Sequence, residues 1–391
     1  MVLWLCAMRI VCISVSEIPS SKANAIQVMK ACQALAQVGH EVVLLAPKDD
    51  GRRATDNRLS DPPSPIELVQ FYGLQATFPV EWMTAQPRWK RYDFCWQAVI
   101  RASQLRADAV YVWPLQSAVF AVLRGLPTLL ELHGPPEGSL GPLLFRLFLS
   151  LPGKKRLLPI TKALLGILAP KYSVLRVPIS ISPNGVEIER YQNLPSPPAA
   201  RHALGLADNP TVGYTGHLYA GRGLNLLIEL ARRFREVQFV WVGGRPEEVT
   251  SWQSRLAADG ITNITLTGFV ENSILPRYQS ACDVLLMPYE RIIAGSSGGN
   301  SAAYCSPMKM FEYMACGRAI ISSDLPVIHE VLNERNAVLC PPEEADAWAT
   351  ALQKLLDSPG QRQALARQAL ADVQQYSWIE RARRALEGFC E

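Results

Sequence analysis

The feature that most constrains this chain is an alternation of short apolar runs with amphipathic helical segments, which occurs twice. In the first half, an apolar β-branched run at 9–16 leads into a helical segment at 24–38 and then a second apolar run at 41–47. Parallel strands need helix-length crossovers, so this order is typical of a parallel sheet covered by helices. The pattern begins again at 211–215. The sequence therefore predicts an α/β protein with two doubly wound, Rossmann-like domains.

The same reasoning assigns the remaining elements. In segment 24–38, Asn24 is a candidate N-cap, Gly39 a stop signal, and Gln27, Lys30 and Gln33 share one polar face. We expect further strands at 66–72, 109–113, 128–133, 177–182, 211–215, 237–242, 264–267, 284–288 and 319–322, with helices at 224–234 and 308–314.

A Pro-rich segment separates the two halves. Residues 192–200 read QNLPSPPAA, which indicates a linker and the best domain boundary. Ligands of doubly wound sheets bind beyond the carboxyl ends of the strands. With two such domains, we expect the ligand site in a central cleft that both domains face.

Composition excludes several classes of protein. Hydrophobic residues make up 49% of the 391 residues and charged residues 19%, which is too apolar for a disordered chain. The net charge of +4 is too small to indicate a nucleic-acid-binding protein. Residues 1–195 carry +7 and residues 196–391 carry −3. This asymmetry is either chance or a sign that the first half meets an anionic surface.

The cysteines and the apolar start indicate where the protein works. Nine scattered cysteines, an odd number without metal-ligand spacing, are typical of free thiols in a reducing compartment. No apolar run reaches the roughly 18 residues that cross a bilayer. The apolar start has no basic residues before it, so we interpret it as a buried strand and not as a signal peptide. These observations predict a cytoplasmic protein.

One glycine-rich turn has the chemistry of a phosphate site. Gly216 and His217 follow a predicted strand, and the sequence Gly221-Arg222-Gly223 opens the next helix. Glycines allow close backbone approach, and a helix N-terminus offers N–H donors to an anion. Arg222 can bind a diphosphate with its planar guanidinium. A solvated turn is the alternative for both His217 and Arg222.

Several stretches together resemble the retaining glycosyltransferases of family four, which have the glycosyltransferase-B fold. They are GYTGHLYAGRGLNLLIEL (213–230), ITLTGFVENSILPRYQSACDVLLMPY (264–289), SPMKMFEYMACGRAIISSDLPVIHEVL (306–332), SSKANAIQVMKACQALAQVGHEVVLLAP (20–47), LLELHGPP (129–136) and SPNGVEIERY (182–191). The resemblance implies an acceptor-binding domain at 1–190, a nucleotide-sugar-binding domain at 191–375 and a last helix, 376–391, that packs back on the first domain.

The resemblance also assigns roles in donor binding. In the family, the glutamate at the position of Glu312 holds the donor ribose, backbone N–H groups around Met308 and Lys309 hold phosphate, and the loop with Gly268 and Val270 binds the base. Lys309 is also a candidate charge partner, or an exposed lysine. Gly216 lies at the diphosphate. The family usually has Arg and Lys where this chain has His217 and Arg222. A second family glutamate is replaced by Tyr304.

On the acceptor side, the resemblance implies that His133 lies near the reacting sugar, where an ordinary structural histidine is the alternative. Ser21 and Asn24 occupy the first strand–helix loop, where the family often has two glycines. If His217 touches the diphosphate, its charge should make the donor bind more tightly as pH falls from about 8 toward 6.

The expected activity is metal-independent transfer of a sugar, with retention, from a nucleoside-diphosphate sugar to a glycan or lipid-linked acceptor. His133, Arg222 and His217 are the expected catalytic residues, and no metal or other cofactor is expected because no D-x-D motif occurs. Apolar segments 94–100 and 140–151 with basic flanks (Arg88, Lys90, Arg91, Lys154, Lys155 and Arg156) are either ordinary amphipathic helices or a surface for an anionic membrane.

Three alternatives remain open at the level of sequence. A sugar-nucleotide epimerase or phosphorylase would share the architecture. A two-domain nicotinamide oxidoreductase would need glycines after the first strand, where SEIPSSKAN has none. A non-catalytic sugar-binding scaffold is the third, favoured by Tyr304.

Overall fold

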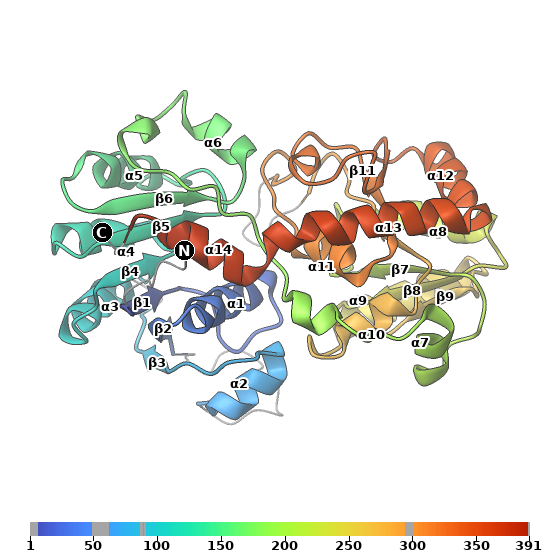
Figure 1. The fold of residues 1–391 in the computed structure, drawn as a ribbon, viewed down its shortest axis with the longest axis horizontal. Helices are drawn as coiled ribbons and strands as arrows, with labels where there is room; N and C mark the ends of the chain where they lie inside the picture. The colour runs from blue at the N-terminus through green and yellow to red at the C-terminus, as the bar shows by residue number, and fades with distance from the viewer. Residues whose placement is uncertain (1–6, 49–61, 87–88, 90, 294–299, 390–391) are drawn as a thin grey trace. The chain divides into compact units, whose positions relative to one another are not determined.

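The computed structural model describes residues 7–48, 62–86, 89, 91–293 and 300–389 (Figure 1). The chain divides into two compact units. The first comprises the residues up to Asn184 together with those from Trp378 onward, and the second comprises Gly185–Ser377. The second crossing falls between Ser377 and Trp378, so the last helix belongs to the first unit.

Within its described residues, the first unit is built on a six-stranded parallel sheet in the order β3-β2-β1-β4-β5-β6. Its strands are β1 (Arg9–Ile13), β2 (Glu41–Pro47), β3 (Val80–Met83), β4 (Ala109–Val112), β5 (Thr128–Leu132) and β6 (Lys155–Pro159). The helices are α1 (Ala23–Gln37), α2 (Pro65–Tyr72), α3 (Tyr92–Gln104), α4 (Leu115–Leu123), α5 (Gly141–Ser150), α6 (Lys162–Leu168) and α14 (Trp378–Leu386), with a 3-10 turn η2 (Val174–Arg176).

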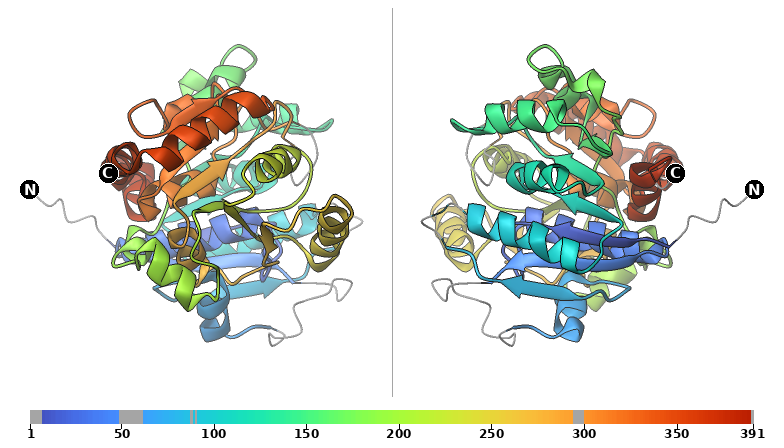
Figure 2. Two further views of the ribbon diagram at one scale, coloured as in Figure 1. Left: turned by 90° about the vertical axis from the view of Figure 1, so that its right-hand side faces the viewer. Right: turned by 90° about the vertical axis from the view of Figure 1, so that its left-hand side faces the viewer.

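The helices of the first unit form two groups. Helix α14 packs against α1, while α4 packs between α3 and α5 (Figure 2, right). Because the strand order reverses beside β1, right-handed crossovers place these two groups on opposite faces of the sheet. This reversal is the doubly wound pattern that the sequence predicts.

The second unit repeats the architecture with a six-stranded sheet, in the order β12-β11-β10-β7-β8-β9 over its described residues. Its strands are β7 (Thr211–Thr215), β8 (Gln238–Val242), β9 (Ile264–Leu266), β10 (Val284–Met287), β11 (Ala319–Ser323) and β12 (Val338–Cys340). The helices are α7 (Pro197–Ala203), α8 (Leu224–Arg233), α9 (Pro246–Ala258), α10 (Leu275–Ser280), α11 (Met308–Cys316), α12 (Ala345–Asp357) and α13 (Pro359–Val373), with the 3-10 turns η3 (Ile188–Tyr191), η4 (Ile328–Glu330) and η5 (Gln374–Tyr376).

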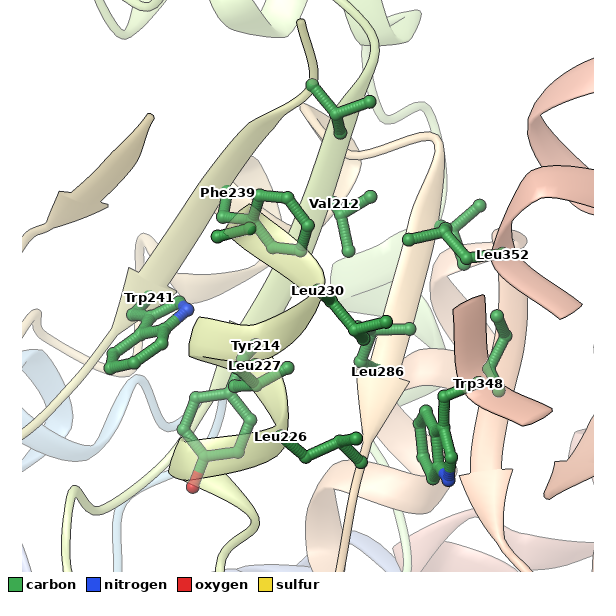
Figure 3. Close-up of a cluster of buried hydrophobic side chains, with 14 of the residues drawn as sticks. Val212, Tyr214, Leu226, Leu227, Leu230, Phe239, Trp241, Leu286, Trp348 and Leu352 are labelled. Atoms are coloured by element: carbon green, nitrogen blue, oxygen red, sulfur yellow. The ribbon is translucent and has the colours of Figure 1, made fainter. Parts of the chain in front are cut away.

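The core of the second unit lies where α8 and α12 meet the sheet. Leu227 and Leu230 of α8, Leu286 of β10 and the large rings of Trp241 and Trp348 are all fully buried (Figure 3). Helix α8 reads LNLLIELARR, so its apolar side chains recur at the helical period and cover the sheet. This packing fixes the β7–α8 turn, where the site described below lies.

The strand predicted at 66–72 is wrong, because these residues form helix α2. Ser64 caps it with a reciprocal pair of bonds: its hydroxyl accepts from the Glu67 N–H at 3.3 Å, and its own N–H donates to the Glu67 carboxylate at 2.7 Å. Pro65 occupies the first helical position, and Gly73 ends the helix in a left-handed conformation. The Ser-Pro-x-Glu start favours a helix more strongly than the β-branched residues favour a strand.

The strand predicted at 177–182 is also wrong. This segment follows β6 and bonds to it, with the Leu157 N–H donating to the Pro178 carbonyl and the Ser180 N–H donating to Leu157, but it forms only an isolated bridge at Ile179 among the described residues. Pro178 in this segment and Pro159 in β6 have no N–H to give, so the ladder cannot extend in either direction from the bridge. The sequence does not predict strands β3, β6 and β12.

Helix α1 departs from its prediction at both its start and its polar face. Its N-cap is Lys22, with no side-chain cap bond, so Asn24 is not the cap. Gln27, Lys30 and Gln33 are buried, although their spacing predicts a solvent-facing side. Lys30, for example, donates to the Gly73 carbonyl at 2.9 Å. The α2 region and α14 cover this face, which periodicity alone cannot show.

Candidate functional site

The residues of the predicted phosphate turn lie at the carboxyl end of β7. Gly216 has φ of +139°, a conformation that side-chain-bearing residues rarely adopt. A Cβ atom added there would lie 2.6 Å from Nζ of Lys309, which comes from α11. The Lys309 ammonium in turn lies 4.1 Å from the centroid of the Tyr214 ring. The structure thus brings the β7 turn and the start of α11 into one site.

Arg222 is held at this site by aromatic side chains. Its Cζ lies 4.9 Å from the ring centroid of Tyr219 and 5.1 Å from that of Tyr289. Its Nη2 donates to the Tyr219 hydroxyl at 2.8 Å. Its Nε is buried and has no hydrogen-bond partner in the part of the chain that the structure describes. This N–H can therefore donate to a bound ligand or water.

His217 completes a cluster of three nitrogen bases. Its ring stacks on that of Tyr219, with 5.2 Å between centroids. Burial and the nearby charges of Arg222 and Lys309 lower the pKa of His217 to about 4. Burial, with Arg222 beside it, also lowers the pKa of Lys309 well below its usual value. In the described residues, neither Arg222 nor Lys309 forms an ion pair. Basic side chains gathered without a carboxylate ion pair suit an anion, because a bound anion favours their charged forms.

The helix that follows this cluster contributes backbone donors. Pro307 is the N-cap of α11, and the Met310 N–H bonds back to its carbonyl at 3.1 Å. The N–H groups of Met308 and Lys309 have no acceptor within the described residues. At the start of α8, the N–H of the N-cap residue Gly223 donates to the Glu290 carboxylate at 3.2 Å. The start of α11 therefore offers free N–H groups to an anion.

Glu312 lies one turn further along α11. It is half-buried, and its Oε2 accepts a hydrogen bond from Nε2 of Gln279 at 3.3 Å. The neighbouring Tyr313 hydroxyl is bound to the Thr215 backbone N–H at 2.8 Å, which ties this turn of α11 to β7. Glu312 thus lies on the helix that also carries Lys309, and this helix is bonded to the end of β7, which Gly216 follows.

Gly268 and Val270 follow strand β9, which is separated from β7 by β8. The Gly268 carbonyl accepts from the Gly243 N–H at 2.8 Å, and the Gly216 N–H donates to the Val242 carbonyl at 2.8 Å. The turns after β7, β8 and β9 therefore form one hydrogen-bonded rim, and Val270 is half-buried in it.

The predicted acceptor-side residues belong to the first unit. His133 is the first residue beyond β5, and its Nε2 lies 2.6 Å from Oε1 of the buried Glu131. Ser21 and Asn24 are exposed near the start of α1, where Nδ2 of Asn24 donates to the Ser16 hydroxyl at 3.2 Å. The structure links His133 to Glu131 and Arg381, and no contact links it to Ser21 or Asn24 among the described residues.

The sequence does not predict four of the candidate functional residues: Tyr219 and Tyr289 around Arg222, and Glu131 and Arg381 beside His133. Tyr219 stands three residues before Arg222, and Glu131 two before His133, so their proximity in sequence was available as a signal. Tyr289 and Arg381 lie on distant segments, and nothing in the sequence alone connects them to these sites.

Comparison with known proteins identifies the family. The profile of "Glycosyltransferase Family 4" matches residues 25–190, and that of "Glycosyl transferases group 1" matches residues 209–358. The chain belongs to glycosyltransferase family four. The family resemblance of the sequence motifs is confirmed. The first matched region covers most of the first unit and runs a few residues past Asn184, and the second lies within the second unit.

Curated relatives match only part of their length. An alpha-D-kanosaminyltransferase of Streptomyces kanamyceticus is 27% identical over 43% of this chain and 42% of its own. A phosphatidyl-myo-inositol mannosyltransferase of Mycolicibacterium smegmatis is 28% identical over 50% of this chain and 47% of its own. The chain spans about half the length of these relatives or less.

Solved structures share the fold over nearly the whole chain. The match to HepE of Anabaena in complex with UDP covers 97% of this chain and 99% of HepE, with a TM-score of 0.71 and 18% identity. The match to a glycosyltransferase of Rickettsia africae covers 98% of this chain and 98% of that protein, with a TM-score of 0.75 and 12% identity. The predicted glycosyltransferase-B fold is confirmed.

Two further features bear on cofactors and membranes. In the ranges that the structure describes, no group of three or more His, Cys, Asp or Glu side chains could hold a metal ion. Among the same residues, every helix is too short or too polar to cross a membrane.

Proposed function

We propose that this protein transfers a sugar, with retention of configuration, from a nucleoside-diphosphate sugar to a glycan or lipid-linked acceptor. The observation that carries the proposal is the cluster of the basic side chains of His217, Arg222 and Lys309, none of which forms an ion pair with a carboxylate within the described residues. A diphosphate supplies the missing negative charge. Its oxygens would also accept from the unpartnered Nε of Arg222.

The reaction needs this charge because the diphosphate is the leaving group. As the bond from the anomeric carbon to the phosphate oxygen breaks, negative charge grows on the diphosphate. The acceptor hydroxyl attacks the same face, and its proton passes to the departing phosphate oxygen. Arg222, His217 and the first N–H groups of α11 stabilise that charge without a metal ion, and preorganised donors of this kind give the largest catalytic effects.

The second unit is proposed to bind the donor. Gly216 lets the diphosphate approach the β7 turn, and Met308 and Lys309 bind it from α11. Glu312 accepts hydrogen bonds from the two ribose hydroxyls, and the backbone of Gly268 and Val270 contacts the base. HepE, which shares the fold, is seen with UDP and with UDP-glucose. UDP is therefore the first ligand to test.

The first unit is proposed to bind the acceptor, with His133, Ser21 and Asn24 on its ligand side. The names of the relatives include both a phosphatidyl-myo-inositol mannosyltransferase and a 2-deoxystreptamine glucosyltransferase. The exposed apolar side of α5 favours a lipid-linked acceptor. Leu140, Leu143 and Leu147 are exposed there, beside Arg146 and Lys154. This protein then works at the cytoplasmic face of an anionic membrane.

The predicted basic flank of that surface is corrected by the structure. Lys155 is buried in β6 and donates to the carbonyls of Phe148 at 2.7 Å and Leu149 at 3.0 Å, so it caps the end of α5. Nη1 of Arg91 donates to the Val15 carbonyl. Arg88 and Lys90 lie outside the described residues.

The test combines binding with turnover. We expect UDP or another nucleoside diphosphate in a calorimetric panel to bind, and the matching nucleotide sugar to transfer to a lipid or glycan acceptor. NMR of the product anomeric proton then shows whether configuration is retained. Binding without transfer or hydrolysis for any donor would favour the sugar-binding scaffold. No binding by any nucleotide would reject the proposal.

A further inference from the structure

A buried carboxylate stands behind the proposed acceptor-side histidine. Glu131 and His133 are two residues apart at the end of β5, so their side chains leave the same face of the sheet. Oε1 of Glu131 lies 2.6 Å from Nε2 of His133. Glu131 is fully buried, while 37% of the His133 side chain is exposed. The pair therefore has one inner, fixed end and one outer, accessible end.

Every other contact of this carboxylate is with a donor. Oε1 also accepts from Nε2 of Gln27 at 2.6 Å and lies 2.7 Å from Nη2 of Arg381. Oε2 accepts from the hydroxyl of Tyr111. Burial alone would raise the pKa of Glu131, but Arg381 and the His133 hydrogen bond outweigh it and lower that pKa to about 2. The carboxylate carries no proton of its own.

The donor directions fix the tautomer of the neutral imidazole. A carboxylate can only accept, so Nε2 of His133 must carry the ring proton. Nδ1 is then the lone-pair nitrogen, and it has no hydrogen-bond partner in the described part of the chain. An oriented imidazole of this kind accepts a hydrogen bond from a hydroxyl, a group that both sugars and acceptors carry.

The last helix of the chain supplies the balancing charge. Arg381 of α14 is fully buried and also donates to the Pro183 carbonyl at 2.8 Å and to the Tyr111 hydroxyl at 3.2 Å. It thus reaches the carboxylate from a segment that lies far along the chain from Glu131. Without Arg381, the Glu131 charge would be buried and unbalanced.

We propose that Glu131 is a positioning residue that holds His133 in its Nε2–H tautomer, so that Nδ1 accepts a hydrogen bond from a substrate hydroxyl, and that Arg381 supports Glu131 in this role. The inference rests on the proposed function for the identity of the hydroxyl. The tautomer itself does not depend on that function.

The test begins with nitrogen NMR of protein labelled with ¹⁵N-histidine. The chain has 5 histidines, and a His133→Gln variant assigns the resonances of His133. At high pH, where the ring is neutral, we expect the proton on Nε2 in wild-type protein. A wild-type ring with its proton on Nδ1, or with an equal mixture of tautomers, would overturn the proposal.

The variants must separate positioning from folding. Glu131→Gln alone leaves Arg381 buried without its partner and can unfold the unit. The charge-balanced pair Glu131→Gln with Arg381→Met removes both charges at similar volume. An amide can either donate or accept, so the tautomer of His133 should become mixed. Circular dichroism and a melting curve report whether the double variant is folded.

The matched control is Ser180→Ala, which removes another contact of α14, the 3.2 Å bond from the Ser180 hydroxyl to the Arg384 carbonyl. It should leave the tautomer and the turnover as in wild type. In the double variant, kcat should fall about tenfold to hundredfold, as for other groups that orient a histidine, with the donor KM unchanged. A folded double variant with wild-type tautomer and kcat would contradict the proposal.

Failure of the two proposals can be told apart. If wild-type protein transfers no sugar, the proposed function fails, while the tautomer spectrum still decides whether Glu131 orients His133. If transfer is normal in wild type and in a folded double variant whose tautomer has changed, the proposed function is supported and the positioning role of Glu131 is rejected.

Discussion

Arg222 is bound by Tyr219 through both its ring and its hydroxyl: the guanidinium carbon lies 4.9 Å from the ring centroid, and Nη2 donates to the hydroxyl at 2.8 Å. A planar guanidinium can stack and donate at once, whereas an ammonium cannot do both in this geometry. This pairing explains why an arginine fits a position where the family usually has a lysine. The Nε of Arg222 is buried, and no acceptor for its N–H is found in the described part of the chain.

Arg222→Lys should therefore weaken binding of UDP, although the family usually carries lysine there. The loss of a charge-assisted hydrogen bond is worth about 1.5–3 kcal/mol, or roughly tenfold to a hundredfold in affinity. Calorimetry measures it directly. Tyr219→Phe is the control, because it keeps the ring and removes only the hydroxyl, and its effect should be smaller. Unchanged affinity in Arg222→Lys would mean that Arg222 does not contact the diphosphate.

Glu312→Ala should weaken nucleotide binding and leave the fold intact. It removes the acceptor for two ribose hydroxyls, each hydrogen bond being worth about 1 kcal/mol or somewhat more with the charge. The readout compares the affinities for a nucleoside diphosphate and for pyrophosphate, which lacks ribose, so only the former should fall. Glu344→Ala, at an exposed position of the same unit, controls for the change in net charge. Equal affinity of variant and wild type for the nucleotide would exclude the ribose contact.

The pH dependence of donor binding follows from His217, whose pKa is lowered to about 4 by burial and by the charges of Arg222 and Lys309. The ring is thus neutral in the free protein at pH 6 to 8. A bound diphosphate raises the pKa, so binding takes up a proton and tightens as pH falls. The tightening should appear between about pH 6 and pH 4, below the window of 8 to 6 that the sequence indicates.

The probe for this prediction is a nucleotide sugar, because its diphosphate is esterified at both ends. The control is His217→Arg, which fixes the charge and should flatten the profile. Calorimetry of both proteins across the range checks the effect. If the two profiles coincide, His217 does not touch the phosphates and is an ordinary turn residue.

Gly216→Ala should both destabilise the second unit and weaken donor binding. At φ of +139°, a residue with Cβ is strained by about 1–3 kcal/mol. The added methyl group would also displace the Lys309 ammonium, which lies 2.6 Å away. Chemical denaturation and calorimetry measure the two effects. Gly360→Ala, in helix α13 with open space around it, should instead be neutral or stabilising.

Binding to anionic vesicles tests the surface of α5. With Leu143 and Leu147 exposed beside Arg146, the protein should co-sediment with anionic vesicles and be released by high salt, because exposed charges are screened. Leu143→Glu with Leu147→Glu should abolish the binding. Ile66→Glu, at an exposed position on α2, should not. Equal recovery with neutral and anionic vesicles would make α5 an ordinary solvated helix.

Much of the proposed donor site is visible in the local sequence. Gly216, His217, Arg222 and Glu312 lie in short stretches whose residue types already match phosphate and diol chemistry. Tyr289 follows β10, the strand beside β7, and packs on Arg222, so its part in the site depends on strand order. Strand order is a long-range property and leaves no periodic signal in the chain.

Errors in the prediction have the same origin. Residues 66–72 have strand-like composition, but the Ser64–Glu67 capping box makes them helix α2. Lys155 looks like a surface charge in the sequence, yet it lies in a strand and caps α5. In both cases a specific partner outweighs an average preference.

The sequence by itself determined the two parallel α/β units, because apolar strands and amphipathic helices alternate with their own periods, and it placed the phosphate turn at a strand end. The tertiary structure alone decided which charges are buried together. Glu131 and Arg381 are far apart in the chain and pair only because α14 returns to the first unit. Burial strengthens each such interaction and shifts its pKa, and burial exists only once the chain has folded.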